Sequence, residues 1–166
     1  YKEISKIPLN EDFESAGSFF KSIERNDESI PLLSTEMRKT TDPDMVFEGS
    51  SSGIITLTAD TNYVELESIS SLLIANNIGW SILEMDYKTD IAFTVGVFIK
   101  NDIESVRLPS LTINPKDEWN KIYIHMTPQI GAPTQVSSYK IFLNAYKSDE
   151  TKDATILLDN IKLIHQ

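Results

Sequence analysis

The stretch LEMDYK holds two carboxylates at a spacing that acid–base chemistry can use. Glu84 and Asp86 are two residues apart, and in an extended strand such residues share a face, with alpha carbons about 6.5–7 Å apart. Their carboxyl groups can then approach the roughly 5–5.5 Å that retaining glycoside hydrolysis requires. The same spacing is also typical of a solvated strand face, and Lys88 follows on that face as a balancing charge.

The stretch resembles the E-x-D-x-E strand of the laminarinase-like jelly-roll glycoside hydrolases, which supplies a nucleophile, a helper and an acid/base. Here Lys88 stands where the third carboxylate should be, and without that acid no proton reaches the leaving oxygen. His125 and His165 are the only histidines and have no metal-binding spacing, and the sequence contains no P-loop or G-x-S-x-G motif. We therefore predict that the chain is not an enzyme, and we keep a glycoside hydrolase as a minor alternative.

Aromatic side chains at outward strand positions indicate a binding surface, because a fully solvated face rarely collects many rings. A flat ring can pack on the C–H face of a pyranose while nearby polar groups bond its hydroxyls. Cross-strand pairing that only stabilises the sheet is the alternative for these rings. We expect stacking by Trp119, Tyr123, Phe142 and Tyr146, and hydroxyl binding by Glu84, Asp86, Lys121 and Asn144.

Period-two alternation between turn residues predicts the strands that position these groups. A hairpin is expected at Asp60-Thr61, and short helical turns only within 11–24 and 68–77. Eight or so strands joined by turns predict one antiparallel β-sandwich over residues 1–166, of jelly-roll type. The expected strands are Gly53–Ala59, Asn62–Ser68, Trp80–Lys88, Ile91–Lys100, Glu118–Met126, Ser138–Lys147 and Thr155–His165.

Composition narrows the classes of partner. The formal charge of -10, with 15 scattered Lys and Arg, disfavours nucleic acid because an acidic surface repels phosphate backbones. The chain has no cysteine, which excludes disulfides and thiolate chemistry. No apolar run reaches the roughly 18 residues of a spanning helix. We expect a monomer.

Four stretches together resemble the galactose-binding-like jelly rolls, the fold of many carbohydrate-binding modules. They are DFES (Asp12–Ser15), EGSSSG (Glu48–Gly53), WNKIYIHM (Trp119–Met126) and LLDNIKL (Leu157–Leu163). The match is nearest to lipoprotein-like versions in surface proteins of sugar-degrading gut bacteria. The resemblance implies non-catalytic glycan recognition at or outside the cell surface, with a lipid anchor upstream. A structural or protein-interaction domain that binds no sugar is the alternative.

Asp159 and Asn160 interrupt the apolar run TILLDNIKLIH near the end of the chain. The resemblance implies that Asp159 and Glu14 bind a structural calcium ion, with Glu48 or the neighbouring serines as further ligands. A buried carboxylate must be paired or coordinated, and calcium takes hard oxygen ligands. The alternative is that the two residues form a β-bulge or cap a neighbouring turn. Both explanations remain open at the level of sequence.

Overall fold

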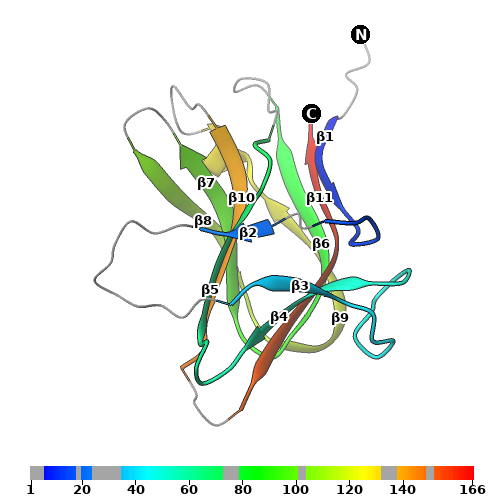
Figure 1. The fold of residues 1–166 in the computed structure, drawn as a ribbon. Helices are drawn as coiled ribbons and strands as arrows, with labels where there is room; N and C mark the ends of the chain where they lie inside the picture. The colour runs from blue at the N-terminus through cyan, green and yellow to red at the C-terminus, as the bar shows by residue number, and fades with distance from the viewer. Residues whose placement is uncertain are drawn as a thin grey trace.

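In the described part of the chain, eleven strands pair into two antiparallel sheets that pack face to face in the computed structural model (Figure 1). The structure describes residues 6–17, 20–23, 35–72, 79–100, 104–131, 138–148 and 152–166. Sheet A has the order β3-β4-β11-β6-β9, with β1 also on β11, and its strands are β1 (Lys6–Glu11), β3 (Met37–Thr40), β4 (Ser52–Leu57), β6 (Ser81–Thr89), β9 (Lys116–His125) and β11 (Ala154–His165).

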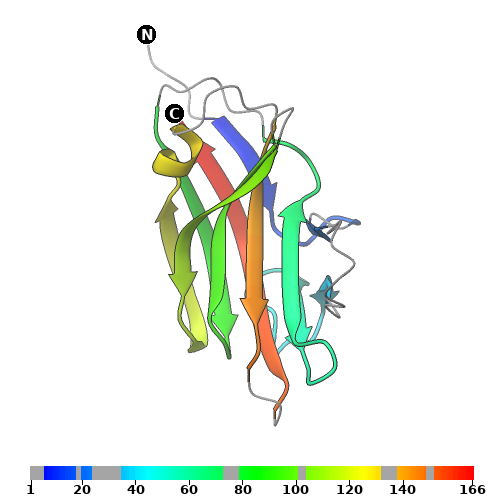
Figure 2. The same ribbon diagram turned by 90° about the vertical axis from the view of Figure 1, so that its left-hand side faces the viewer.

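Sheet B has the order β2-β5-β10-β7-β8 and lies toward the viewer in Figure 2. From β4 onward the chain passes from one sheet to the other at almost every connection, which is the jelly-roll arrangement predicted from the sequence. The strands of sheet B are β2 (Phe20–Ser22), β5 (Tyr63–Ser68), β7 (Phe93–Lys100), β8 (Ser105–Ile113) and β10 (Ser138–Tyr146).

The expected hairpin at Asp60-Thr61 is wrong. This turn joins β4 of sheet A to β5 of sheet B, so the two strands it connects do not pair. A short polar turn reverses the chain in both cases, and local sequence does not distinguish a hairpin from a crossing between layers. Among the described strands, consecutive ones pair only in β3–β4 and β7–β8.

The core lies between the sheets and is built from the inward residues of the alternating strands. Leu83, Met85 and Tyr87 of β6 are buried there, as their spacing predicts. The inward faces of the neighbouring strands behave in the same way, because side chains alternate between the two sides of a strand. The inward set includes Phe93, Val95, Val97 and Ile99 of β7, Ile141, Leu143 and Ala145 of β10, and Ile124 of β9.

The interruption at Asp159 and Asn160 is a β-bulge. Asn160 has a φ of 47°, and the pairing of β11 with β6 shifts between Asp159 and Lys162. The other neighbour of β11 changes at the same point, from β4 along 154–158 to β1 along 161–165. The polar pair therefore marks the place where one long strand exchanges partners, and the extra residue restores the inward direction of Ile161 and Leu163.

Four strands are absent from the expected set, namely β1, β2, β3 and β8. The helical turn expected within 11–24 is wrong for the described residues there, since β2 is a strand and 11–17 form no helix. β8 was not predicted, because Pro109 lies within it and its apolar and polar residues alternate only weakly. Proline has no backbone N–H to donate, and β8 tolerates this because it is an edge strand and Pro109 lies beside a register shift.

The helix α1 (Thr127–Gly131) was also not predicted. Residues 68–72 form no helical turn, and 73–78 lie outside the described residues. No helix in the described ranges has the length and apolar character needed to cross a bilayer.

Candidate functional site

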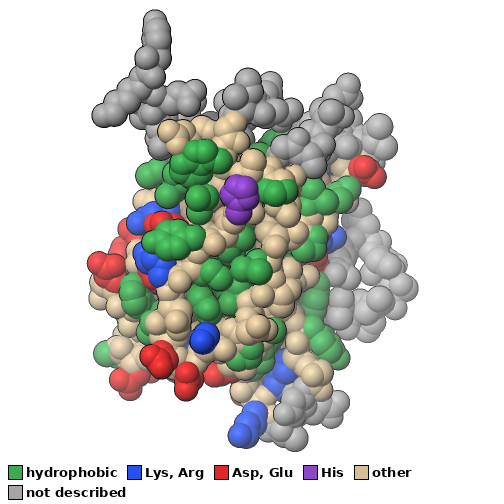
Figure 3. Space-filling model, turned by 180° about the vertical axis from the view of Figure 1, so that it is seen from behind, with side chains coloured by type: hydrophobic (Ala, Val, Ile, Leu, Met, Phe, Trp, Pro, Cys, Tyr) green, Lys and Arg blue, Asp and Glu red, His purple; other side chains and the backbone are tan. Residues whose placement is uncertain are grey.

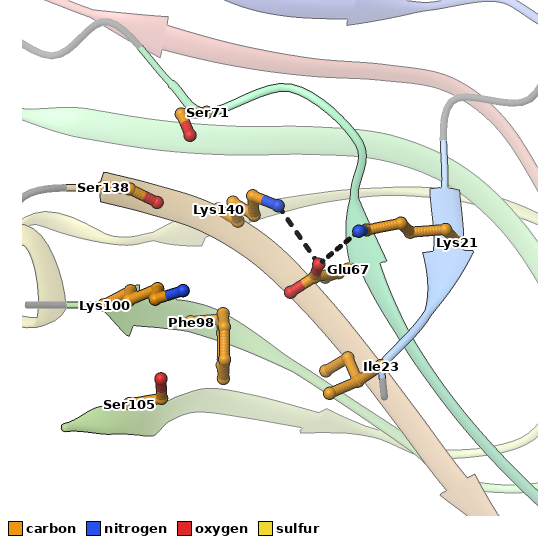
Figure 4. Close-up of a pocket in the computed structure, with 9 residues that line it drawn as sticks. All are labelled: Lys21, Ile23, Glu67, Ser71, Phe98, Lys100, Ser105, Ser138 and Lys140. Atoms are coloured by element: carbon orange, nitrogen blue, oxygen red, sulfur yellow. Dashed lines mark hydrogen bonds and ion pairs between the residues drawn. The ribbon is translucent and has the colours of Figure 1, made fainter. Parts of the chain in front are cut away.

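The outward face of sheet B is hollowed into a groove of about 470 Å³. Side chains from all five strands of the sheet line it, so the groove crosses the strands instead of following one of them (Figure 4). They include Lys21 of β2, Glu67 of β5, Lys140 of β10, Phe98 of β7 and Ser105 of β8.

The carboxylate of Glu67 is the most enclosed charge in this groove. Its strand alternates so that Val64 and Leu66 enter the core, which turns Glu65 and Glu67 outward. Glu67 is nevertheless only 7% exposed. Its Oε1 lies 3.1 Å from the Lys140 ammonium and 3.4 Å from that of Lys21. Two cations therefore share one carboxylate oxygen, and their charges offset the cost of removing that carboxylate from water.

Glu65 forms a second ion pair that crosses the face. Its partner is the guanidinium of Arg107 on β8, although β10 and β7 lie between their strands. The Arg107 side chain must therefore pass over the sheet, and its guanidinium carbon lies 5.4 Å from the centre of the Phe98 ring. The hydroxyl of Tyr63 donates to Glu65 at 2.7 Å. These contacts hold Glu65 at 3% exposure.

Phe142 forms part of the floor of this face and is not an exposed platform. It is directly opposite Gly96 of β7, and a Cβ at Gly96 would lie 2.6 Å from the Phe142 ring. The ring therefore occupies the space that the glycine leaves empty, and its exposure is 1%. Tyr146, farther along the same strand, is 61% exposed and sits opposite Tyr63. Between the two tyrosines and the groove lies Asn144, opposite Thr94.

The outward face of sheet A carries a different arrangement. The Lys121 ammonium lies 3.4 Å from Asp86, and that of Lys162 lies 3.7 Å from Glu84, each from a directly opposed strand position. Tyr123 is 64% exposed on β9. Trp119, on the same face, packs against Phe47 with ring centres 5.1 Å apart. Figure 3, viewed from behind, shows apolar side chains across the centre and mixed charges along the left margin.

The eight residues expected to bind sugar point away from the core, but they do not share a surface. Three lie on sheet B and five on sheet A, on opposite sides of the sandwich. The expectation of one gathered surface is therefore corrected, because the strands that carry these residues belong to different layers. Phe142, Asn144 and Tyr146 are on sheet B, and Glu84, Asp86, Trp119, Lys121 and Tyr123 are on sheet A.

The carboxylates of Glu14 and Asp159 both hold the segment 48–52. Glu14 accepts from the backbone N–H groups of Ser50 and Ser51 at 2.8 and 3.0 Å. Gly49, with a φ of 72°, leaves room for that carboxylate, since a Cβ there would lie 2.4 Å from it. Asp159 accepts from the Ser52 hydroxyl at 2.7 Å and, through the same oxygen, from the N–H of residue 48 at 3.3 Å.

Both carboxylates that were expected to bind calcium accept hydrogen bonds from the protein itself. Within the ranges that the structure describes, no three acidic or histidine side chains converge as a metal site would require. Burial raises the pKa of Asp159, while hydrogen bonds to Glu14, first from Ser50, lower the pKa of that carboxyl. Burial therefore disfavours the charged form of Asp159, and the hydrogen bonds that it accepts offset part of that cost. Calcium at Glu14 and Asp159 stays a prediction.

Five residues of this face were not expected from the sequence, namely Lys21, Glu67 and Lys140 of the groove and the pair Glu65 and Arg107. One signal was present: YVELES has acidic residues two apart between apolar ones, the same pattern as LEMDYK. The position of Arg107 carried no signal, because its strand was not predicted and its partner is three strands away.

Solved structures of carbohydrate-binding modules share this architecture. The CBM22-1 xylan-binding domain of Paenibacillus barcinonensis has a TM-score of 0.61 at 12% identity, over 99% of this chain and 97% of that one. A family 11 module from Clostridium thermocellum, in complex with a β-1,3-1,4-mixed-linked tetrasaccharide, has a TM-score of 0.60 at 15% identity, over 96% and 94%.

A larger structure also contains the fold. It comprises the CBM22-1 and GH10 modules of a Clostridium thermocellum endo-1,4-β-D-xylanase complexed with xylohexaose, and it aligns with a TM-score of 0.65 at 9% identity, over 96% of this chain and 28% of that one. No protein-family model matches the sequence, and no curated protein matches it. The two-sheet architecture and these structures together identify the fold as the β-sandwich jelly roll found in carbohydrate-binding modules.

Proposed function

We propose that this chain binds a carbohydrate on the outward face of sheet B and catalyses no reaction on it. The observation that carries the proposal is the groove itself, in which the Phe98 ring lies among charged and hydroxyl side chains from five strands. A sugar offers alternating apolar C–H faces and hydroxyl groups, so it needs a ring and hydrogen-bonding groups within one hollow.

The face is long enough for a chain of sugar units. Lys140, Phe142, Asn144 and Tyr146 are successive outward positions on β10, and residues two apart in a strand are separated by about 6.5–7 Å. The distance from Lys140 to Tyr146 is therefore about 20 Å. The exposed Tyr146 ring would contact one end of such a chain, and the charged and hydroxyl groups around Phe98, itself only 9% exposed, would contact the other.

Xylan and a mixed-linkage tetrasaccharide are the ligands named for the two similar structures. Xylan is a polysaccharide too large to cross a membrane unaided, and we therefore propose an extracellular or cell-surface location. The lipid anchor expected from the family resemblance is part of the same proposal. Protease treatment of intact cells that express the full-length protein tests this location, because an internal protein would resist digestion until the cells are lysed.

A panel of polysaccharides, examined by affinity gel electrophoresis and then calorimetry, tests the binding proposal. Tyr146→Ala should weaken binding about tenfold, a loss of about 1.4 kcal/mol that is typical of one stacked ring. Tyr123→Ala is the matched control, since it removes an equally exposed tyrosine (64% against 61%) from sheet A.

A loss only from Tyr123→Ala would place the binding surface on sheet A, and equal losses from both variants would contradict a site confined to sheet B. A blank result across plant, host and microbial polysaccharides would contradict sugar binding and favour the structural or protein-interaction role.

A further inference from the structure

The charge of the groove differs in sign from that of the chain. The protein carries a formal charge of -10, whereas the described residues that line the groove include three lysines and one glutamate. Lys21, Lys100 and Lys140 come from three different strands, β2, β7 and β10. Lys21 and Lys140 share the single carboxylate of Glu67, so this group of three side chains carries a net positive charge, and a hollow focuses the field of such a group.

Two of these cations are held by the same atom. The ammonium groups of Lys21 and Lys140 both approach Oε1 of Glu67, at 3.4 and 3.1 Å. One carboxylate thus pairs with two ammonium groups, and water compensates little of the charge on Lys140 because its side chain is only 16% exposed. In Figure 4 both side chains extend toward Glu67 from opposite sides, and Lys100 approaches from the far end of the pocket.

Neutral hydrogen-bonding groups surround the same space. The hydroxyls of Ser71, Ser105 and Ser138 line the groove together with the Phe98 ring. Ser138, Lys100 and Ser105 are opposed in register on three adjacent strands, so Lys100 is flanked by a hydroxyl on each side. A single ligand group can be bonded by an ammonium and two hydroxyls in this row.

We infer that the groove takes an acidic saccharide, one that carries a carboxylate or a sulfate ester; this inference rests on the proposed function. A negative group entering between the lysines forms charge-assisted hydrogen bonds, which are roughly twice as strong as neutral ones. It also supplies the second negative charge that Glu67 alone does not provide. A neutral sugar would desolvate the same ammonium groups without that compensation.

The sharpest probe is one polymer in two forms. Glucuronoxylan should bind at least tenfold more tightly than the same preparation with its carboxylates reduced to alcohols, since backbone and chain length are unchanged. The preference should weaken between about 50 and 500 mM salt because added ions screen partly exposed charges. Chondroitin sulfate beside its desulfated form distinguishes a preference for sulfate from one for carboxylate.

Charge variants locate the effect. Lys100→Gln should weaken binding of glucuronoxylan several-fold and weaken binding of the reduced polymer by a clearly smaller factor. Lys88→Gln makes the same change on the outward face of sheet A, opposite Leu157, and should change neither. Glu67→Gln should strengthen binding of glucuronoxylan several-fold, because it removes the one carboxylate that competes with the ligand for Lys21 and Lys140. Thermal melts establish that each variant is folded.

The outcomes separate this inference from the proposed function. If both polymers bind equally and Tyr146→Ala weakens both, the groove binds sugar but does not select acid, and the inference is overturned. If neither polymer binds and the neutral and sulfated glycans also fail, the inference and the proposed function fall together. If Glu67→Gln weakens binding of glucuronoxylan in a folded protein, the carboxylate is itself a ligand contact, which overturns the assigned role of the lysines.

Discussion

Each sheet carries two acidic residues two positions apart on its outward face, Glu84 and Asp86 on β6 and Glu65 and Glu67 on β5. On sheet A the carboxylates pair with lysines directly opposite them on neighbouring strands. On sheet B, Glu67 also has a lysine directly opposite it, Lys21 of β2, but Lys140 shares the same carboxylate oxygen. In addition, Arg107 reaches Glu65 across two intervening strands, and the groove lies on this side.

The difference shows that the spacing of acidic residues does not make a site. On sheet A each carboxylate has one lysine on a neighbouring strand, although Asp86 is only 1% exposed. On sheet B one carboxylate oxygen is shared by two lysines, and a guanidinium crosses the face. Beside these charges the Phe142 ring fills the space that Gly96 leaves, so the packing of this face also depends on a glycine and a buried ring.

The largest effect is expected from filling the floor of sheet B. Gly96→Val places a Cβ 2.3 Å from the carbonyl oxygen of Leu108 and 2.6 Å from the Phe142 ring. Because one of these atoms is backbone, the β7–β8 pair must separate, and we expect a loss of at least about 3 kcal/mol in the free energy of unfolding. Urea denaturation measures it.

Gly53→Ala in β4 is the comparison on sheet A. Its Cβ would meet only the distal atoms of the Phe13 ring, at 2.6 Å, and a ring can shift more easily than a backbone. We expect a loss of about 1 kcal/mol. Equal losses at the two glycines would show that the floor of sheet B is no more constrained than sheet A.

Calcium addition should produce the next effect, at the margin of sheet A. If Glu14 and Asp159 bind the ion, calcium at a hundredfold over its dissociation constant adds about 2.7 kcal/mol to stability, and chelator removes it. Thermal melts of the wild type and of Asp159→Asn measure the response, which the substitution should abolish. An unchanged melting temperature in the wild type would leave the two carboxylates as hydrogen-bond acceptors for the segment 48–52.

Breaking one ion pair on each face compares two buried carboxylates. Arg107→Ala leaves Glu65, which is 3% exposed, with the Tyr63 hydroxyl, and Lys121→Ala leaves Asp86, which is 1% exposed, with the amide of Asn160 at 3.1 Å. Each variant leaves a buried carboxylate without that cation, so we expect a loss of about 2 kcal/mol from both. Denaturant titrations at low and high salt measure both, and a much smaller loss at Lys121 would show that the two pairs are not equivalent.

The smallest effect concerns the bulge of β11. Asn160→Ala and Asn160→Gly both remove the amide contacts with Glu48 and Asp86, so they differ chiefly in backbone preference. With a φ of 47° at this position, the alanine variant should be less stable than the glycine variant by about 1 kcal/mol. Equal stabilities would mean that the bulge relaxes when the side chain is lost.

Much of the fold was accessible from the sequence because strand alternation is a local property. The inward and outward residues of β6, β7 and β10 follow directly from their order along the chain. β8 was missed because it contains Pro109 and alternates only weakly, so its local sequence does not indicate a strand. Only its pairing with β7 in the structure identifies it as one. The polar pair in β11 was recognised as a bulge or an ion site, and the bulge is present.

The sequence by itself therefore determined which side of each strand faces the core, and the β-sandwich class that follows from it. Only the tertiary structure decided which strands share a sheet, since that depends on pairing between residues far apart in the chain. For this reason Tyr123 and Tyr146, both outward and almost equally exposed, lie on opposite sides of the molecule. The groove arises in the same way, because Lys21, Glu67 and Lys140 come together only when β2, β5 and β10 lie side by side.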